Sequence, residues 1–64
     1  MLAVNLKNAR EKLGLSQEDV AKAVGITQPA YSYYESGLKC PTVPVLIQLS
    51  EVLKISMDEL AKGE

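Results

Sequence analysis

Apolar residues recur at helical spacing along much of this chain. One stripe lies in the segment from about Leu2 to Leu13 and consists of Leu6, Ala9 and Leu13. Another lies in a segment that begins near Val43 and consists of Leu46, Leu49, Val52 and Leu53. Because no segment alternates at the strand period over a useful length, the pattern predicts an all-α fold.

Capping residues mark the predicted helix boundaries. Glycines that favour a left-handed C′ conformation follow three of the helical patterns, at Gly14, Gly25 and Gly37. Residues able to cap a helix N-terminus precede four of them, at Ser16, Thr27, Thr42 and Ser56. Ser56 and Glu59 also have the spacing of a capping box.

These signals predict a compact five-helix domain that covers residues 1–64. The expected helices are Leu2–Leu13, Gln17–Val24, Gln28–Ser36, one that begins near Val43, and Met57–Lys62, which ends at Gly63. The second and third are joined by a tight turn at Gly25. This arrangement is typical of a helix-turn-helix, whose second helix enters the major groove of DNA.

Composition excludes several classes of function. The chain has one cysteine, Cys40, and no histidine. It therefore lacks the residues that an internal disulfide, a cysteine-based zinc site and most acid–base catalysis use. We therefore expect no enzyme activity, no metal or other cofactor and no small-molecule ligand. No apolar run reaches the roughly 18 residues of a membrane span, and no signal-peptide pattern is present. The expected location is the cytoplasm.

The net charge of −1 and the isoelectric point of about 5.3 argue against DNA binding. Nucleic-acid binders usually carry a basic excess, because neutralising phosphates supplies much of their affinity. The distribution of charge over one face matters more than its sum, however, so DNA binding remains open.

The third predicted helix has two different faces. One carries Gln28, Pro29, Ser32, Tyr33 and Ser36, while the other carries Ala30, Tyr31 and Tyr34, with Glu35 at the boundary. The first face has no acid, and Gln28 can pair bidentately with adenine N6 and N7. Ser32, Tyr33 and Pro29 are further candidates for contacts with bases. The alternative interpretation is a helix face that is merely solvated.

A longer set of residues resembles the lambda repressor and Cro type of helix-turn-helix domain, the XRE family, and especially the five-helix domains of lambdoid phage repressors. The matching residues are Leu6, Arg10, Leu13-Gly14-Leu15, Ser16-Gln17-Glu18, Ala21, Val24-Gly25-Ile26-Thr27, Tyr34-Glu35-Ser36-Gly37, Pro41, Leu46, Leu49, Leu53 and Leu60. The resemblance covers essentially the whole chain and implies the same fold.

The resemblance also implies roles for individual residues. Arg10 and Glu35 match a structural ion pair, with the arginine near a DNA phosphate. Gln17 matches a phosphate contact, Gln28 a base-reading glutamine, and Ser36 a contact with the DNA backbone. Ser32 and Tyr33 stand where family members read bases. Our candidate set of phosphate contacts consists of Arg10, Gln17, Thr27, Ser36 and Lys39, and that of base contacts consists of Gln28, Pro29, Ser32 and Tyr33.

Two departures from the family pattern affect the expected affinity. Pro29 stands where the family often has a second polar base reader, and the loop after Gly37 has one cation, Lys39, in place of a cluster. We therefore expect modest affinity for a single domain and binding as a dimer.

The resulting hypothesis is a sequence-specific transcriptional regulator, expected to act as a repressor, that binds double-stranded DNA as a homodimer. The dimer surface is expected around the fifth helix and the loop before the fourth. Such a protein would be bacterial or from a phage, and associated with the nucleoid when bound. The alternative is a protein-interaction module of the same shape, such as an antitoxin or adaptor, which the acidic isoelectric point favours.

Overall fold

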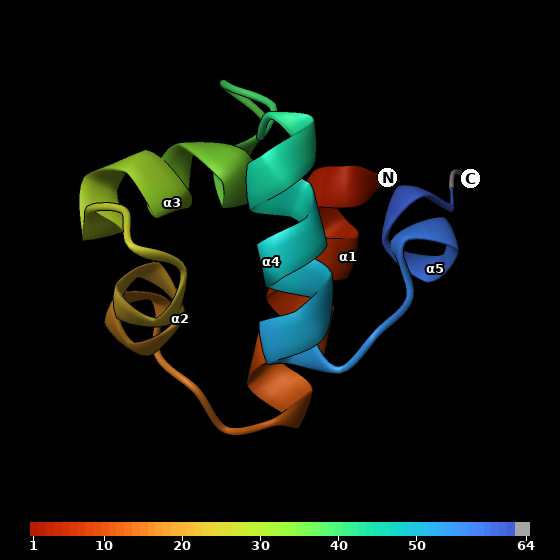
Figure 1. The fold of residues 1–64 in the computed structure, drawn as a ribbon, viewed down its shortest axis with the longest axis horizontal. Helices are drawn as coiled ribbons and strands as arrows, with labels where there is room; N and C mark the ends of the chain where they lie inside the picture. The colour runs from red at the N-terminus through yellow and green to blue at the C-terminus, as the bar shows by residue number, and fades with distance from the viewer. Residues whose placement is uncertain (63–64) are drawn as a thin grey trace.

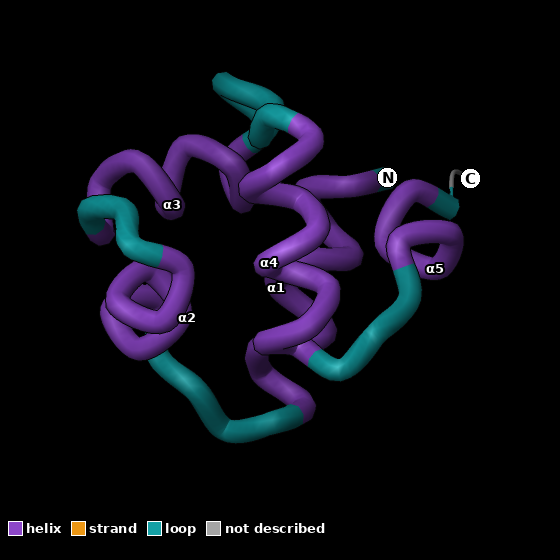
Figure 2. The backbone as a smooth tube through the Cα atoms, viewed as in Figure 1, coloured by secondary structure: helices purple, strands orange, loops and turns teal. Residues whose placement is uncertain are grey.

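The computed structural model describes residues 1–62 and shows five helices joined by short connections (Figure 1). They are α1 (Leu2–Lys12), α2 (Gln17–Val24), α3 (Gln28–Ser36), α4 (Val43–Leu53) and α5 (Met57–Ala61). Residues 1–62 contain no strand (Figure 2), so the predicted all-α, five-helix architecture is confirmed. None of the helices within this range is long and apolar enough to span a membrane.

The helix bounds agree closely with the sequence pattern. The bounds of α2 and α3 are those predicted, whereas α1 and α5 each end one residue early. The predicted stop at Gly63 lies outside the described residues.

Side-chain caps begin three of the helices, including α3. At α2, Ser16 Oγ accepts the backbone N–H of Asp19, and the Asp19 carboxylate accepts that of Ser16, both at 3.0 Å. This reciprocal pair is a capping box. The box predicted at Ser56 is only half formed. Ser56 Oγ accepts the Glu59 N–H at 3.1 Å, but the Glu59 carboxylate lies 3.8 Å from the Lys62 ammonium instead.

The two ends of α4 also differ from the sequence pattern. Thr42 is the N-cap residue, but its side chain makes no capping hydrogen bond. Pro44, in the first turn, lacks one of the N–H groups that such a side chain can bond. At the other end, Lys54 adopts the left-handed conformation, with φ 57° and ψ 44°. The remaining left-handed positions are the predicted ones, with φ of 72°, 77° and 83° at Gly14, Gly25 and Gly37.

A single apolar cluster with side chains from all five helices forms the core. Its buried members are Leu6, Ala9, Val20, Ala21, Val24, Tyr31, Leu49, Leu53 and Leu60. The stripe predicted for α4 packs as expected, with Leu46 and Val52 partly buried against the cluster. Leu13 was expected on the buried face of α1 but is 41% exposed, because α1 ends before it and the chain turns away.

The packing places α3 at one edge of the molecule. α1 lies behind α4 at the centre of Figure 1, with α2 and α3 on one side and α5 on the other. α3 contacts α1 and α2, and α2 also contacts α4. One face of α3 is covered by these neighbours, and the opposite face is left to solvent.

The start of α1 holds α5 in place through polar contacts. The side-chain amide of Asn5 donates to the carbonyl oxygens of Leu60 and Lys62, both at 2.8 Å, and to that of Glu59 at 3.3 Å. The ammonium of Met1 donates to the Lys62 carbonyl at 3.0 Å. The last carbonyls of a helix have no partner within the helix, so Asn5 acts as a C-cap supplied by another helix.

The left-handed lysine gives a prediction about stability. Lys54→Gly is expected to raise the free energy of unfolding by about 1 kcal/mol, because glycine adopts positive φ without the steric strain of a Cβ atom. Gly25→Ala is the opposite change and is expected to lower it by a similar amount, although nothing lies within 4 Å of the added Cβ. Thermal denaturation measures both, since about 1 kcal/mol shifts the Tm of a small domain by about 4–8 °C. Equal Tm values for Lys54→Gly and the parent would show that Lys54 is not strained.

Candidate nucleic-acid interface

α2 and α3 are joined by the short turn at residues 25–27. Gly25 ends α2 in the left-handed conformation, and the Ile26 N–H donates to the Ala21 carbonyl at 3.0 Å. Thr27 then begins α3, its Oγ1 accepting the Ala30 N–H at 3.2 Å. Both sides of the turn are therefore fixed by hydrogen bonds, and α3 begins directly against α2. This is the geometry of a helix-turn-helix.

The inward and outward faces of α3 consist of the residues that the sequence pattern assigned to them. Tyr31 is fully buried, and Tyr34 packs beside it with the two rings edge to face and their centroids 6.3 Å apart. The outward face consists of exposed Gln28, Pro29, Tyr33 and Ser36, with Ser32 half-buried beside them. The one acidic residue of α3 is Glu35, which points toward α1.

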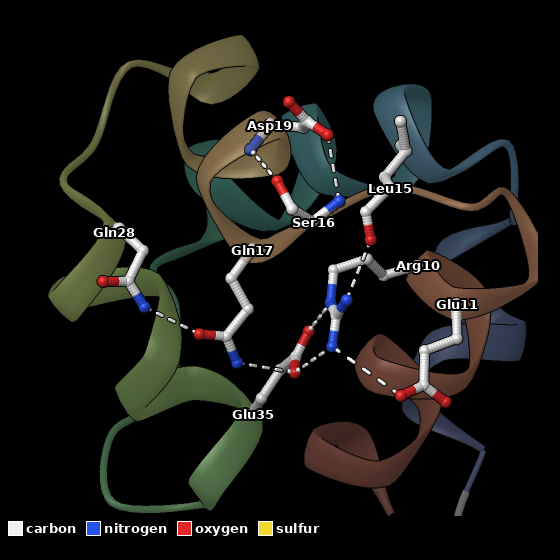
Figure 3. A network of polar contacts seen from close by, with 8 residues as sticks. All are labelled: Arg10, Glu11, Leu15, Ser16, Gln17, Asp19, Gln28 and Glu35. Atoms are coloured by element: carbon white, nitrogen blue, oxygen red, sulfur yellow. Dashed lines mark hydrogen bonds and ion pairs between the residues drawn. The ribbon is translucent and has the colours of Figure 1, made fainter.

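Glu35 forms an ion pair with Arg10 of α1 through two hydrogen bonds. Arg10 Nε donates to Glu35 Oε2 at 2.7 Å, and Nη2 donates to Oε1 at 3.1 Å (Figure 3). The exposed fraction is 12% for the Arg10 side chain and 4% for that of Glu35. Arg10 Nη1 also donates to the Leu15 carbonyl at 2.8 Å. The guanidinium therefore ties α1 to the last turn of α3 and to the connection before α2.

The surroundings of Glu35 keep it ionised. Burial is the largest single influence and raises the pKa of Glu35, but the hydrogen bonds and charge of Arg10, together with the adjacent Tyr31 hydroxyl and the Gln17 amide, outweigh it. The net result is a lowered pKa. Burial raises the pKa of the Tyr31 hydroxyl, and the adjacent carboxylate raises it further. That hydroxyl is buried, with no hydrogen-bond partner among the described residues.

Two glutamines extend the ion pair to the first turn of α3. Gln17, the first residue of α2, donates from Nε2 to Glu35 Oε1 at 3.0 Å. Gln28, the first residue of α3, donates from Nε2 to Gln17 Oε1 at 2.7 Å (Figure 3). Gln17 is half-buried and Gln28 is exposed. Gln17, a candidate phosphate contact, and Gln28, a candidate base contact, are therefore hydrogen-bonded to each other.

The remaining candidate contacts lie at the two ends of α3. Thr27 uses its Oγ1 in the helix cap. Ser36 Oγ donates to the Tyr33 carbonyl at 3.0 Å. The Lys39 ammonium lies 5.4 Å from the centroid of the Tyr33 ring, within cation–π range. This contact brings the cation of the following loop to an exposed side chain of α3.

A family model described as helix-turn-helix matches residues 6–60. The chain belongs to this family, of the XRE, Cro/C1 type. It is 44% identical to the uncharacterized HTH-type transcriptional regulator YqaE of Bacillus subtilis (strain 168) over 64 residues, which are 100% of this chain and 55% of YqaE. It is 38% identical over 55 residues to the cryptic phage CTXphi transcriptional repressor RstR of Vibrio cholerae (serotype O1, El Tor Inaba N16961), covering 86% of this chain and 49% of RstR. The chain thus spans about half the length of these relatives.

Two solved structures contain the fold of this chain over its whole length. The P22 c2 repressor, in complex with synthetic operator 9T in the presence of Tl⁺, has a TM-score of 0.93 and 31% identity, with 100% of this chain and 97% of that chain covered. A transcriptional regulator from Listeria innocua has a TM-score of 0.89 and 28% identity, with 100% and 60% covered. These relatives belong to a class of regulators that are not enzymes, in agreement with the expectation from the sequence.

The sequence of this XRE-type domain did not reveal how the two glutamines are connected. The bond between Gln17 and Glu35 joins residues 18 positions apart, and that between Gln17 and Gln28 joins residues 11 positions apart. The resemblance paired Glu35 with Arg10, and the boundary position of Glu35 on α3 agreed with that pairing, but neither indicated a bond from Gln17. Asn5 carried no signal of its contact with α5.

The lowered pKa of Glu35 gives a prediction about acid stability. A depressed carboxyl pKa contributes stability that is present above the ordinary value of 4.5 and is lost as the pH falls through the folded value. Glu35→Gln is expected to lower the free energy of unfolding at pH 7 by about 3 kcal/mol, because it leaves Arg10 largely buried without its charge partner. The variant should also lose less stability than the parent when acidified below about pH 5.

Denaturant unfolding of both proteins between pH 7 and pH 2 measures this difference. Glu51→Gln, the same substitution at an exposed position of α4, is the matched control and should keep the parental profile. Parallel profiles for Glu35→Gln and the parent would contradict a contribution from the ion pair.

Proposed function

We propose that this protein is a sequence-specific DNA-binding transcriptional regulator, acting as a repressor, that inserts α3 into the major groove of a two-fold operator as a dimer. The observation that carries the proposal is the outward face of α3. This face is exposed, free of acids and fixed at its first turn by the bond between Gln28 and Gln17. A rigid helix that presents short polar side chains suits the major groove.

The arrangement of charge answers the objection raised by the acidic isoelectric point. Glu35 is the acid of α3, and its charge is paired with Arg10 and held away from solvent. Lys39 stands beside Tyr33 at the other end of the helix. The outward face of α3 therefore carries no acid although the whole chain is acidic, and the distribution of charge matters more for binding than its sum.

The candidate contacts take two kinds of role in this proposal. Gln28 reads a base, with Pro29, Ser32 and Tyr33 beside it along the groove. Gln17, Thr27, Ser36 and Lys39 contact phosphates. Arg10 contributes mainly by holding α3, because its donors are directed at Glu35 and Leu15.

Exposed apolar side chains support a dimer. The loop before α4 and the outer face of α4 carry Leu38, 73% exposed, Val43, 62% exposed, and Ile47, 42% exposed. We place the dimer surface on this loop and around α5. Two copies joined there would present their α3 helices to successive major grooves about one helical turn apart.

The relatives support both DNA binding and repression. The P22 c2 repressor structure contains an operator, and RstR is a phage transcriptional repressor. The proposed site of action is the cytoplasm of a bacterium, at the nucleoid when the protein is bound to DNA.

A protein-interaction module is the second candidate. A chain of the SinR protein/SinI protein complex has the same fold, with a TM-score of 0.89 and 27% identity, and that complex is an assembly of two proteins. In this alternative the exposed apolar side chains near α4 would bind a different protein instead of a second copy.

Selection from random duplexes by the purified protein tests the proposed function. We expect enrichment of a palindrome with half-sites about 10–10.5 base pairs apart, and an affinity that falls as salt rises. The absence of any enriched sequence at low salt would overturn DNA recognition and favour the protein-interaction module.

Replacement of the base reader tests the orientation of α3. Gln28→Ala is expected to relax the preference at one base pair in each half-site, with a loss of about 1–3 kcal/mol of discrimination. Gln48→Ala is the matched control, because Gln48 is an exposed glutamine of α4, a helix to which no base contact is assigned. Competition binding with single-base variants of the selected duplex measures both. An unchanged preference in Gln28→Ala would mean that α3 does not read the groove through this residue.

A further inference from the structure

We propose that Glu35 sets the direction of a hydrogen-bond chain through Gln17 to Gln28, and that this direction makes Gln28 select adenine over guanine. The inference rests on the proposed function, because it concerns the base that Gln28 reads. Glu35 is a positioning residue in this scheme, since it acts through Gln17 and does not itself touch DNA.

The chain begins at a group that can only accept hydrogen bonds. An ionised carboxylate has no proton to donate. Arg10 holds the Glu35 carboxylate in place by donating to both of its oxygens. Gln17 can therefore meet Glu35 Oε1 only with its NH₂ group, as it does at 3.0 Å. The oxygen and nitrogen of an amide leave its carbon in different directions. With its nitrogen turned to Glu35, Gln17 turns its oxygen to Gln28, whose Nε2 donates to it at 2.7 Å (Figure 3).

This direction determines what Gln28 can offer to a base. One of its N–H groups is used by Gln17, which leaves the second N–H and the carbonyl oxygen. In the major groove adenine presents the N7 acceptor and the N6 donor, whereas guanine presents two acceptors, N7 and O6. The remaining donor and acceptor of Gln28 match adenine. Guanine requires two donors, which Gln28 can supply only if its amide turns over.

Turning the Gln28 amide over breaks the chain at its other end. The Gln28 oxygen would then face Gln17, and two carbonyl oxygens cannot bond, so the Gln17 amide would have to turn over as well. The Gln17 oxygen would in turn face the Glu35 carboxylate with no proton between them. Glu35 is 4% exposed, so water has little access to replace the lost bond. The lowered pKa of Glu35 keeps it an acceptor at the pH of a binding experiment.

Two substitutions of Gln17 with opposite hydrogen-bonding character test the proposal. Gln17→Lys can only donate, so it bonds Glu35 and also the Gln28 oxygen. This reverses the direction of the hydrogen bond between residues 17 and 28. Gln17→Glu can only accept when ionised, so it still receives the Gln28 N–H. Affinities are measured for the selected duplex and for a variant with guanine in place of adenine at the position where Gln28→Ala relaxes the preference.

The expected result separates chain direction from charge. Gln17→Lys should lower the ratio of adenine to guanine affinity by roughly tenfold, within the range for one bidentate base contact, although its positive charge strengthens binding to both duplexes. Gln17→Glu should weaken binding to both duplexes and keep the ratio within about twofold of the parent, because the direction of the last link is retained. Gln17→Met, which offers neither donor nor strong acceptor, should give an intermediate ratio.

Other outcomes distinguish this inference from the proposed function. If all three variants change both affinities by the same factor, Gln17 acts only on phosphates, and the inference is wrong while DNA recognition stands. If the parent itself does not distinguish the two duplexes, the inference also fails. If the parent binds no duplex selectively, the proposed function fails first. Thermal unfolding establishes that each variant is folded. If Gln17→Lys is unstable, the lower ratio expected for Gln17→Met than for Gln17→Glu keeps the test decisive.

Discussion

The Arg10–Glu35 ion pair joins α1 to the last turn of α3, and the position of the candidate DNA contacts depends on it. α3 has nine residues, and a helix of this length is not stable alone in water. Tyr31, its fully buried side chain, and Tyr34 beside it fix which face of the helix is inside. The ion pair supplies a second anchor at the opposite end from the Thr27 cap. It also removes the acid of α3 from the surface assigned to DNA.

Local signals were sufficient to predict the helix-turn-helix itself. Ser16 and Gly25 enclose α2, and Thr27 and Gly37 enclose α3, and both pairs act within one turn of their own helix. The predictions were wrong where an end depends on contacts elsewhere. Leu13 lies past the last turn of α1, and the Glu59 carboxylate lies near Lys62 rather than at the Ser56 backbone. No residue-type rule marks Lys54 as left-handed.

The outward face of α3 was predictable from its period, because exposure follows from which side of a helix is apolar. The pairing of Arg10 with Glu35 came from resemblance to a family and not from the pattern. The bond between Gln17 and Glu35 had neither source of information. A polar side chain has several acceptors within reach, and only the packed arrangement of three helices determines which one it meets. The same is true of Asn5.

The carbonyl groups at the end of α5 are bonded by Asn5 of α1. Because α5 relies on this outside partner, the α5 side of the domain and the side of α2 and α3 differ in local stability. α5 has five residues and packs mainly against α1 and α4 within residues 1–62, so its order depends on packing rather than on its own hydrogen bonds. Such a segment can open without unfolding the rest of the domain. Because Leu60 is fully buried, opening of α5 would uncover part of the core on the side away from α2 and α3. A partner that binds α5 would thus stabilise the closed form.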